Sequence, residues 1–162
     1  MTSEPAQLTT QLTPLTYERL RAELEDLTTR GRVEIARAIE AARALGDLSE
    51  NGDYHAAKDS QGKMEARIRQ LQATLKSAQV VDVKEGVQLT VSAGTIVTIR
   101  YEGDDETERF FVGSIEERGE GVEVVSPGSP LGKALIGRAK GDSVEYEAPG
   151  GKLRVEIVAV GD

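Results

Sequence analysis

The chain lacks cysteine and tryptophan, and it is poor in aromatic residues and in positive charge. Without cysteine it can form neither a disulfide framework nor a thiolate metal site, which is typical of a reducing compartment. Only 4% of the residues are aromatic, which disfavours a base-stacking surface, and the net charge of -8 disfavours general nucleic-acid affinity. Because no apolar run reaches the length of a membrane span or a signal peptide, we expect a cytoplasmic protein without a membrane partner.

Charge and apolar spacing both change near residue 80, which indicates two domains in the 162 residues. Residues 13–79 carry 11 Lys/Arg and 11 Asp/Glu, whereas residues 80–162 carry 9 Lys/Arg and 16 Asp/Glu. We therefore expect four segments along the chain. These are a flexible tail (1–12), a helical hairpin (13–80), a linker (81–94) and a C-terminal domain (95–162).

Apolar residues at helical spacing predict two long helices before residue 80. The first helix has Thr13 as N-cap and Pro14 at its first position. Its stripe comprises Tyr17, Leu20, Leu24 and Leu27 and, after a phase slip at Arg30-Gly31, Arg32, Ile35, Ile39 and Ala42. The second helix has the unbroken seam of a coiled coil at Tyr54, Ala57, Gln61, Met64, Ile68, Leu71, Leu75 and Ala78. The short connection predicts antiparallel pairing, with a tip near residues 46–52.

From residue 95 the apolar period becomes two, which predicts strands. The predicted strands are Thr95–Tyr101, Arg109–Ile115, Val122–Val125, Ser143–Ala148 and Lys152–Val160. A short helix is predicted over Pro130–Ile136 with Gly137 as its C-cap, and a turn at Gly150-Gly151. The predicted fold class is α+β, an N-terminal antiparallel two-helix coiled-coil hairpin followed by a small, mostly antiparallel sheet domain.

The tip carries two carboxylates, Asp47 and Glu50, which stand three residues apart and can converge. Two carboxylates without a partner His or Cys suit a hard cation such as Mg²⁺. The alternative is a capping box, with Asp47 as N-cap and Glu50 at the third helical position. Asn51 is the better N-cap, because a helix that started at Asp47 would have Gly52 in its second turn. On these residues alone both interpretations stay open.

Basic side chains are expected just behind the tip, because antiparallel pairing brings residues 37–43 alongside roughly 55–61. They form either a patch that contacts a phosphate backbone or a solvated surface of mixed charge. Tyr54 is expected on the seam and His55 on the surface. The basic residues concerned are Arg37, Arg43, Lys58 and Lys63.

The segment Gly46–Asp82 carries the pattern GDL-x-EN-x-x-Y-H-A-A, then a QG pair and an AQV exit from the helix. In this it resembles the Gre family of bacterial transcript-cleavage factors, on the GreA side of the family. Ser129-Pro130 and the LIG-x-x-x-GD run of Leu135–Asp142 extend the resemblance to about residues 13–160. Four positions depart from the commonest family residues. These are Ser49, Gly52 and Asp53, in place of Lys, Ala and Glu, and Gly128, in place of Asn or Asp.

The resemblance implies a transcription elongation factor that has no complete active site of its own. Its C-terminal domain, FKBP-like in the family and without implied isomerase activity, would dock on bacterial RNA polymerase through Ser129 and Pro130. The coiled coil would enter the secondary channel of the polymerase. There Asp47 and Glu50 would help to hold a Mg²⁺ ion shared with the polymerase and position water for cleavage of a backtracked RNA 3′ end. The free factor would bind no cofactor and would be a monomer.

The same resemblance makes Asn51, Tyr54 and Lys58 candidates for contact with the RNA 3′ end or for shaping of the tip. Arg37 and Arg43, from the basic patch expected behind the tip, are further candidates for RNA contact. Two alternative functions are an inhibitor that occupies the channel without cleavage, which the intact carboxylate pair disfavours, and a proline isomerase built on the C-terminal domain. With two Phe and no Trp in the chain, an aromatic-lined proline pocket is disfavoured.

Overall fold

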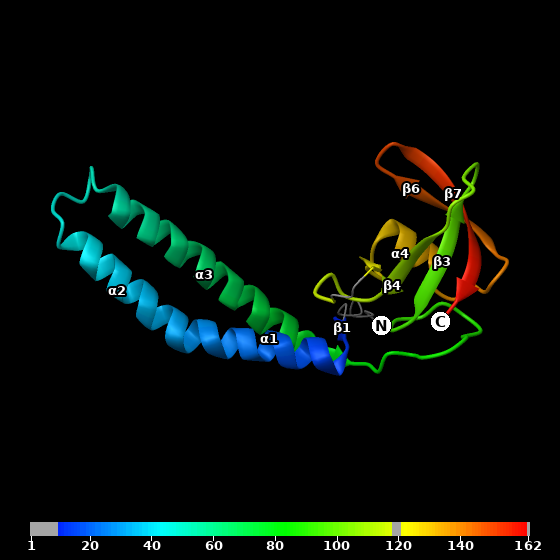
Figure 1. Ribbon diagram of the computed structural model, residues 1–162, viewed down its shortest axis with the longest axis horizontal. Coiled ribbons are helices and arrows are strands. Elements are labelled where there is room, and N and C mark those ends of the chain that lie inside the picture. The colour runs from blue at the N-terminus through cyan, green and yellow to red at the C-terminus, as the bar shows by residue number, and fades with distance from the viewer. Residues whose placement is uncertain (1–9, 118–120, 162) are drawn as a thin grey trace, which may run out of the picture. The chain divides into compact units, whose positions relative to one another are not determined.

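The computed structural model describes residues 10–117 and 121–161, which divide into two compact units (Figure 1). The helical unit comprises residues 17–77, and the sheet unit comprises residues 10–16 together with 78–161. This division confirms the α+β fold class. Among the described residues, no helix combines the length and apolarity that a bilayer crossing requires.

The helical unit is an antiparallel hairpin. One arm consists of α1 (Pro14–Asp26), a π-helical turn (Leu27–Gly31) and α2 (Arg32–Arg43), and the other arm is α3 (Gly52–Ser77). Figure 1 shows the two arms side by side, joined by the loop at one end. The predicted seam is confirmed, since none of its positions from Tyr54 to Ala78 is exposed and Ile68 and Leu71 are each 1% exposed.

Two arginine–carboxylate pairs cross between the arms. Arg67 of α3 donates to both oxygens of Glu23, through Nε at 2.8 Å and Nη2 at 2.9 Å. Arg32 of α2 donates to both oxygens of Glu65, at 3.0 and 3.1 Å. Because bidentate pairs restrict orientation as well as distance, these contacts fix the register of one arm against the other.

The predicted phase slip near Gly31 is a π-helical turn. Such a turn takes in one extra residue, so Leu27 before it and Ile35 after it can both face α3. The prediction that the second stripe begins at Arg32 is wrong, because Arg32 is exposed and pairs with Glu65. The hydroxyls of Thr28 and Thr29 donate to the carbonyl oxygens of Leu24 (2.8 Å) and Glu25 (2.6 Å). These bonds satisfy carbonyl groups beside the wide turn, whose helical bonding is locally disturbed.

The sheet unit is built on five strands in the order β5-β4-β3-β7-β6, antiparallel except for β4–β5, which is parallel. The five predicted strands are confirmed with small shifts at their ends. The predicted turn at Gly150-Gly151 lies one residue earlier, since Ala148 pairs with Gly151. The strands are β3 (Ile96–Tyr101), β4 (Glu108–Val112), β5 (Glu123–Val125), β6 (Ser143–Ala148) and β7 (Gly151–Val160).

The core of the sheet unit lies between the sheet and α4 (Pro130–Leu135). Helix α4 begins at the predicted proline, and Gly137 follows its end with φ of 81°. Leu135 of α4, like Ile99 and Ile157 of the central strands, is fully buried at 0% exposure. The alternating inward residues of the strands therefore have a helix to pack against, as the period of two predicts.

The prediction of a flexible tail over residues 1–12 is wrong at its end. Strand β1 (Gln11–Leu12) pairs in parallel with β2 (Gln79–Val80), and Leu12 is fully buried. A two-residue strand has too few residues for an alternating pattern to be visible in the sequence. Residues 1–9 of the predicted tail lie outside the described residues.

The prediction of a linker over residues 81–94 is also wrong, because this segment belongs to the sheet unit. Val91 is 1% exposed and forms part of the core. The backbone N–H of Gln88 donates to the Val160 carbonyl at 3.0 Å, and the backbone N–H of Val91 donates to the Arg138 carbonyl at 2.8 Å. The segment holds its place through backbone bonds to distant residues, which its irregular sequence does not reveal.

The buried carboxylate of Glu117 holds the first turn of α1. Its oxygens accept hydrogen bonds from the Thr13 N–H (2.7 Å), the Thr13 hydroxyl (2.9 Å) and the Thr16 hydroxyl (2.7 Å). Thr13 Oγ1 also accepts from the Thr16 N–H at 3.4 Å, which confirms Thr13 as the N-cap. A negative charge at the N-terminal end of a helix is favourable, because the helix dipole is positive there.

We expect Glu117→Ala to lower the free energy of unfolding by about 3 kcal/mol, because three donors lose their buried acceptor. Chemical denaturation followed by circular dichroism measures this change. The matched control is Glu102→Ala, at an exposed carboxylate of the same unit, which is expected to shift the free energy of unfolding by less than about 0.5 kcal/mol. Equal effects of the two substitutions would contradict the assigned role of Glu117.

Candidate functional site

The candidate site is the loop that joins the two arms of the hairpin. Helix α2 ends at Arg43 and α3 begins at Gly52, so residues 44–51 form the connection. Gly46 has φ of 128°, a conformation that residues with a side chain rarely adopt, and this lets the chain reverse directly after α2. The loop overlaps the predicted tip near residues 46–52, and every residue from 43 to 50 is exposed.

Asn51 caps α3 and ties it to the end of α2. Its Oδ1 accepts the Tyr54 N–H at 3.1 Å, so the prediction of Asn51 as N-cap is confirmed. Its Nδ2 donates to the Ala42 carbonyl of the last turn of α2 at 2.5 Å, and this carbonyl also accepts the Leu45 N–H at 3.1 Å. The capping-box alternative, with Asp47 as N-cap of the second helix, is therefore wrong.

Asp47 is held by a residue that the sequence interpretation passed over. Its Oδ1 accepts both the Ser49 N–H, at 3.0 Å, and the Ser49 hydroxyl, at 2.9 Å. The spacing of two residues from an Asp to the donating N–H is that of an Asx turn, a signal that was present in the sequence. These two bonds from Ser49 hold the pKa of the Asp47 carboxyl below its ordinary value, because they stabilise the charged form.

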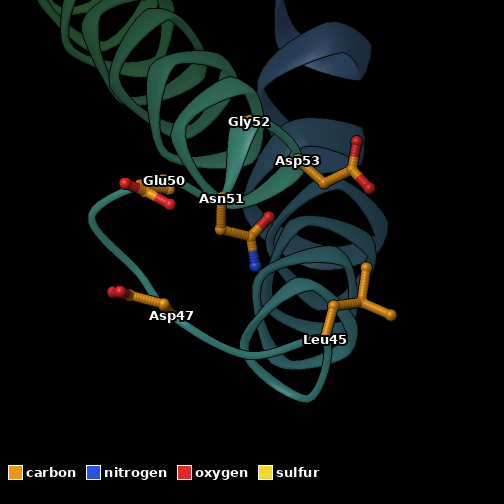
Figure 2. A pocket seen from close by; sticks show the side chains of 6 residues that line it. All are labelled: Leu45, Asp47, Glu50, Asn51, Gly52 and Asp53. Atoms are coloured by element: carbon orange, nitrogen blue, oxygen red, sulfur yellow. The ribbon is translucent and has the colours of Figure 1, made fainter.

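The carboxylates of Asp47 and Glu50 point to the same side of the loop, away from the helices (Figure 2). They share an open hollow of about 390 Å³ with Leu45, Asn51, Gly52 and Asp53. Carboxylate oxygens are suitable ligands for Mg²⁺, which commonly takes one or two of them and completes its shell with water and phosphate. Among the described residues, no three His, Cys, Asp or Glu side chains are grouped to hold a metal. The tip thus fits part of a coordination shell.

We expect the Asp47 carboxyl to titrate below the ordinary value of 3.8 for aspartate. Because the pKa of Asp47 is lowered, the Ser49 bonds stabilise the folded loop fully at pH values above the ordinary pKa of aspartate. This stabilisation is lost as the pH falls through the lowered pKa. Carbon-detected NMR titration measures the pKa of the Asp47 carboxyl. Ser49→Ala is expected to raise this pKa. An unchanged pKa in Ser49→Ala would show that the hydroxyl does not act on this carboxyl.

The structure brings together only part of the predicted basic patch. Arg43 and Lys58 line a shared hollow of about 470 Å³ on the side of the hairpin. The Arg43 guanidinium lies 5.7 Å from the centroid of the Tyr54 ring, and Lys58 Nζ donates to Gln61 at 2.8 Å. Arg37 is exposed on α2 but does not line this hollow.

The remaining predicted positions near the tip take surface roles. Lys63 forms an ion pair with Asp59 at 3.3 Å on the exposed face of α3, which is the mixed-charge surface of the alternative interpretation. His55 is exposed, as predicted, and its ring lies edge-on to Tyr54 at 5.6 Å. Tyr54 itself is half-buried on the seam.

The two residues predicted for docking lie at the start of α4. Ser129 is the N-cap, since its hydroxyl accepts the Gly132 N–H at 3.0 Å and donates to the Ser126 carbonyl at 2.7 Å. Pro130 is the first helical residue and is exposed. The Ser129 side chain therefore shapes the loop, and Pro130 presents the accessible surface.

Two family models match the chain in succession. The model described as "Transcription elongation factor, N-terminal" matches residues 10–80. The model described as "Transcription elongation factor, GreA/GreB, C-term" matches residues 87–162. Together the two matches cover most of the chain.

Curated proteins are similar over nearly the same length. The transcription elongation factor GreA of Saccharopolyspora erythraea is 46% identical over 154 residues, which cover 92% of this chain and 94% of that protein. The GreA of Streptomyces coelicolor is 45% identical over 153 residues, which cover 93% and 91%.

Solved structures of similar proteins were also found. The crystal structure of GreA factor homolog 1 (Gfh1) of Thermus thermophilus is 28% identical, with a TM-score of 0.40, and the match covers 94% of this chain and 99% of that one. The prokaryotic transcription elongation factor GreA/GreB from Nitrosomonas europaea has the same identity, TM-score and coverage.

Proposed function

Because the chain belongs to the GreA/GreB family of transcription elongation factors, we propose that it binds bacterial RNA polymerase and stimulates cleavage of backtracked RNA by the polymerase itself. The hairpin enters the secondary channel of the polymerase and carries the acidic tip to the active centre. The factor has no complete active site of its own, and the bond that breaks is in the RNA 3′ segment held by the polymerase.

The observation that carries the proposal is the placement of Asp47 and Glu50. Both side chains are exposed, and both project from the end of the hairpin, whose longest helix, α3, has 26 residues. At 1.5 Å per residue this helix is about 39 Å long, which gives the hairpin the reach to deliver the tip into a channel. Neither carboxylate has a packing role on this support, and the Glu50 oxygens and Oδ2 of Asp47 stay available to a partner.

In the complex, Asp47 and Glu50 would hold one Mg²⁺ ion together with ligands of the polymerase and would orient the attacking water. When bound, this ion supplies charge stabilisation for the phosphoryl group and lowers the pKa of the water. Asp47 stays ionised at neutral pH, because the Ser49 donors stabilise its charged form. It can therefore accept a hydrogen bond from the water or bind the cation throughout the physiological range.

Arg43 and Lys58 contact the RNA phosphates behind the tip. Their placement beside one hollow of the hairpin supports this role, since phosphate contacts position nucleic acid without reading its sequence. Docking uses the loop at Pro130, which Ser129 shapes through its two hydrogen bonds. Gly128 in this loop provides no side chain for polar contact with the polymerase.

The test is RNA cleavage in stalled, backtracked complexes of RNA polymerase, with and without the protein. Shortened RNA and renewed elongation are the expected results. Blocked elongation without shortened RNA would replace the proposal with a channel-occupying inhibitor. No effect on either reaction, at concentrations that saturate binding, would overturn it.

A further inference from the structure

Both donors of Ser49 bind the same oxygen of Asp47. The N–H lies 3.0 Å and the hydroxyl 2.9 Å from Oδ1. A carboxylate offers roughly four acceptor positions, about two on each oxygen. The two bonds therefore take up Oδ1, while the described part of the chain offers no hydrogen-bond or ion-pair partner to Oδ2.

The second element is the side-chain amide of Asn51, which bridges the two ends of the loop. One side of the amide donates to the Ala42 carbonyl of α2, and the other accepts the Tyr54 N–H of α3. Asn51 is half-buried, whereas every residue from 43 to 50 is exposed. In Figure 2 its amide points toward the end of α2, on the other side from the two carboxylates. This amide thus fixes the distance between the end of α2 and the start of α3, which the exposed loop connects.

From these contacts we infer that Ser49 and Asn51 are positioning residues that hold the Asp47 carboxylate so that Oδ2 alone is presented to a cation. The inference rests on the proposed function, because it concerns how the tip meets the shared ion. Ser49 sets the rotation of the carboxylate, and Asn51 sets the path of the loop that carries it. Glu50 has no partner in the described part of the chain and adapts to the complex.

The two carboxylates therefore meet the ion in different ways. Mg²⁺ demands near-ideal octahedral geometry and gives up its water reluctantly, so a ligand fixed to one oxygen suits it better than one that rotates. Fixing a ligand before binding also removes the entropy cost of immobilising it in the complex. Asp47 is the fixed ligand and Glu50 the mobile one.

The experiment compares three variants and one control in stalled polymerase complexes over a Mg²⁺ titration. Ser49→Ala removes the hydroxyl and keeps the N–H. Asn51→Ala removes both bonds of the bridge, whereas Asn51→Ser keeps a cap for α3 and loses the reach to Ala42. The control is Ser60→Ala, at an exposed serine of α3. Polymerase binding is measured for each protein by competition with the labelled wild type.

A second measurement needs neither polymerase nor activity. Side-chain scalar couplings in the free protein report whether Asp47 occupies one rotamer, and amide hydrogen exchange reports on the Ser49 and Tyr54 N–H groups. In the wild type we expect a single Asp47 rotamer and slowed exchange at both amides. Ser49→Ala is expected to average the rotamer, and Asn51→Ala to speed exchange at Tyr54.

Ser49→Ala is expected to raise the Mg²⁺ concentration for half-maximal cleavage about fivefold, the equivalent of one hydrogen bond, with polymerase binding unchanged. Asn51→Ala and Asn51→Ser are expected to raise it about tenfold, and Ser60→Ala not at all. An averaged rotamer in the wild type, or an unchanged Mg²⁺ dependence in all three variants, would overturn the inference. If the wild type stimulates no cleavage, the proposed function fails, and the rotamer measurement still decides whether Ser49 fixes Asp47.

Discussion

Asp47→Ala and Glu50→Ala are each expected to reduce stimulated RNA cleavage about 100-fold while changing polymerase affinity less than about twofold. Loss of one preorganised group that stabilises a transition-state charge commonly costs this much. Both side chains are exposed and neither caps a helix, so the hairpin should remain folded. Single-turnover cleavage in backtracked complexes, at saturating concentrations of each variant, measures the loss.

Asp53 provides the matched control for this prediction. It lines the same hollow, yet in Figure 2 its carboxylate points away from the side shared by Asp47 and Glu50. Asp53→Ala removes the same charge from the tip, at a cost of a few tenths of a kcal/mol in the first turn of α3. Cleavage should stay within about threefold of the wild type. Full cleavage by both Asp47→Ala and Glu50→Ala would remove the metal-ligand role.

The hairpin could be predicted from the sequence because its contacts are periodic. The seam of α3 repeats every three or four residues, and each repeat supports the same assignment. The cap at Asn51 was also predictable, because Gly52 argues against an earlier helix start. The phase slip near Gly31 was visible as a break in the stripe, but the sequence did not show that a π-helical turn absorbs it.

Other features could not be predicted because they depend on single contacts between distant residues. Glu117 bonds to residues more than 100 positions away, and no local pattern in the sequence marks it as a buried carboxylate. The pairing of β1 with β2 involves two residues on each strand. At the tip, the Asx turn from Asp47 to Ser49 could be predicted from the spacing of these two residues. It was missed because the comparison with the family treats Ser49 only as a replacement for the usual Lys.

Gly132→Ala is expected to lower the free energy of unfolding by about 3 kcal/mol and to weaken polymerase binding at least tenfold. A Cβ at residue 132 would overlap the carbonyl oxygen of Ser126, which is backbone and cannot rotate away. This oxygen also accepts the N–H (3.1 Å) and the hydroxyl (2.7 Å) of Ser129. Relief of the overlap must therefore displace the loop that carries Pro130, the proposed docking residue. Chemical denaturation and competition for polymerase measure the two effects.

Gly128→Ala is the matched control, because it replaces another glycine of this loop without displacing the backbone. The nearest atom to a Cβ at residue 128 is Ser126 Oγ at 3.8 Å, an ordinary contact, so stability should change by less than about 0.5 kcal/mol. Equal denaturation midpoints for Gly132→Ala and the wild type would contradict the close approach of α4 to Ser126. If Gly132→Ala loses stability and polymerase binding while Gly128→Ala keeps both, docking depends on the folded shape of this loop. If Gly128→Ala alone loses binding, the polymerase contacts the backbone at Gly128 directly, and the role given to Pro130 moves there.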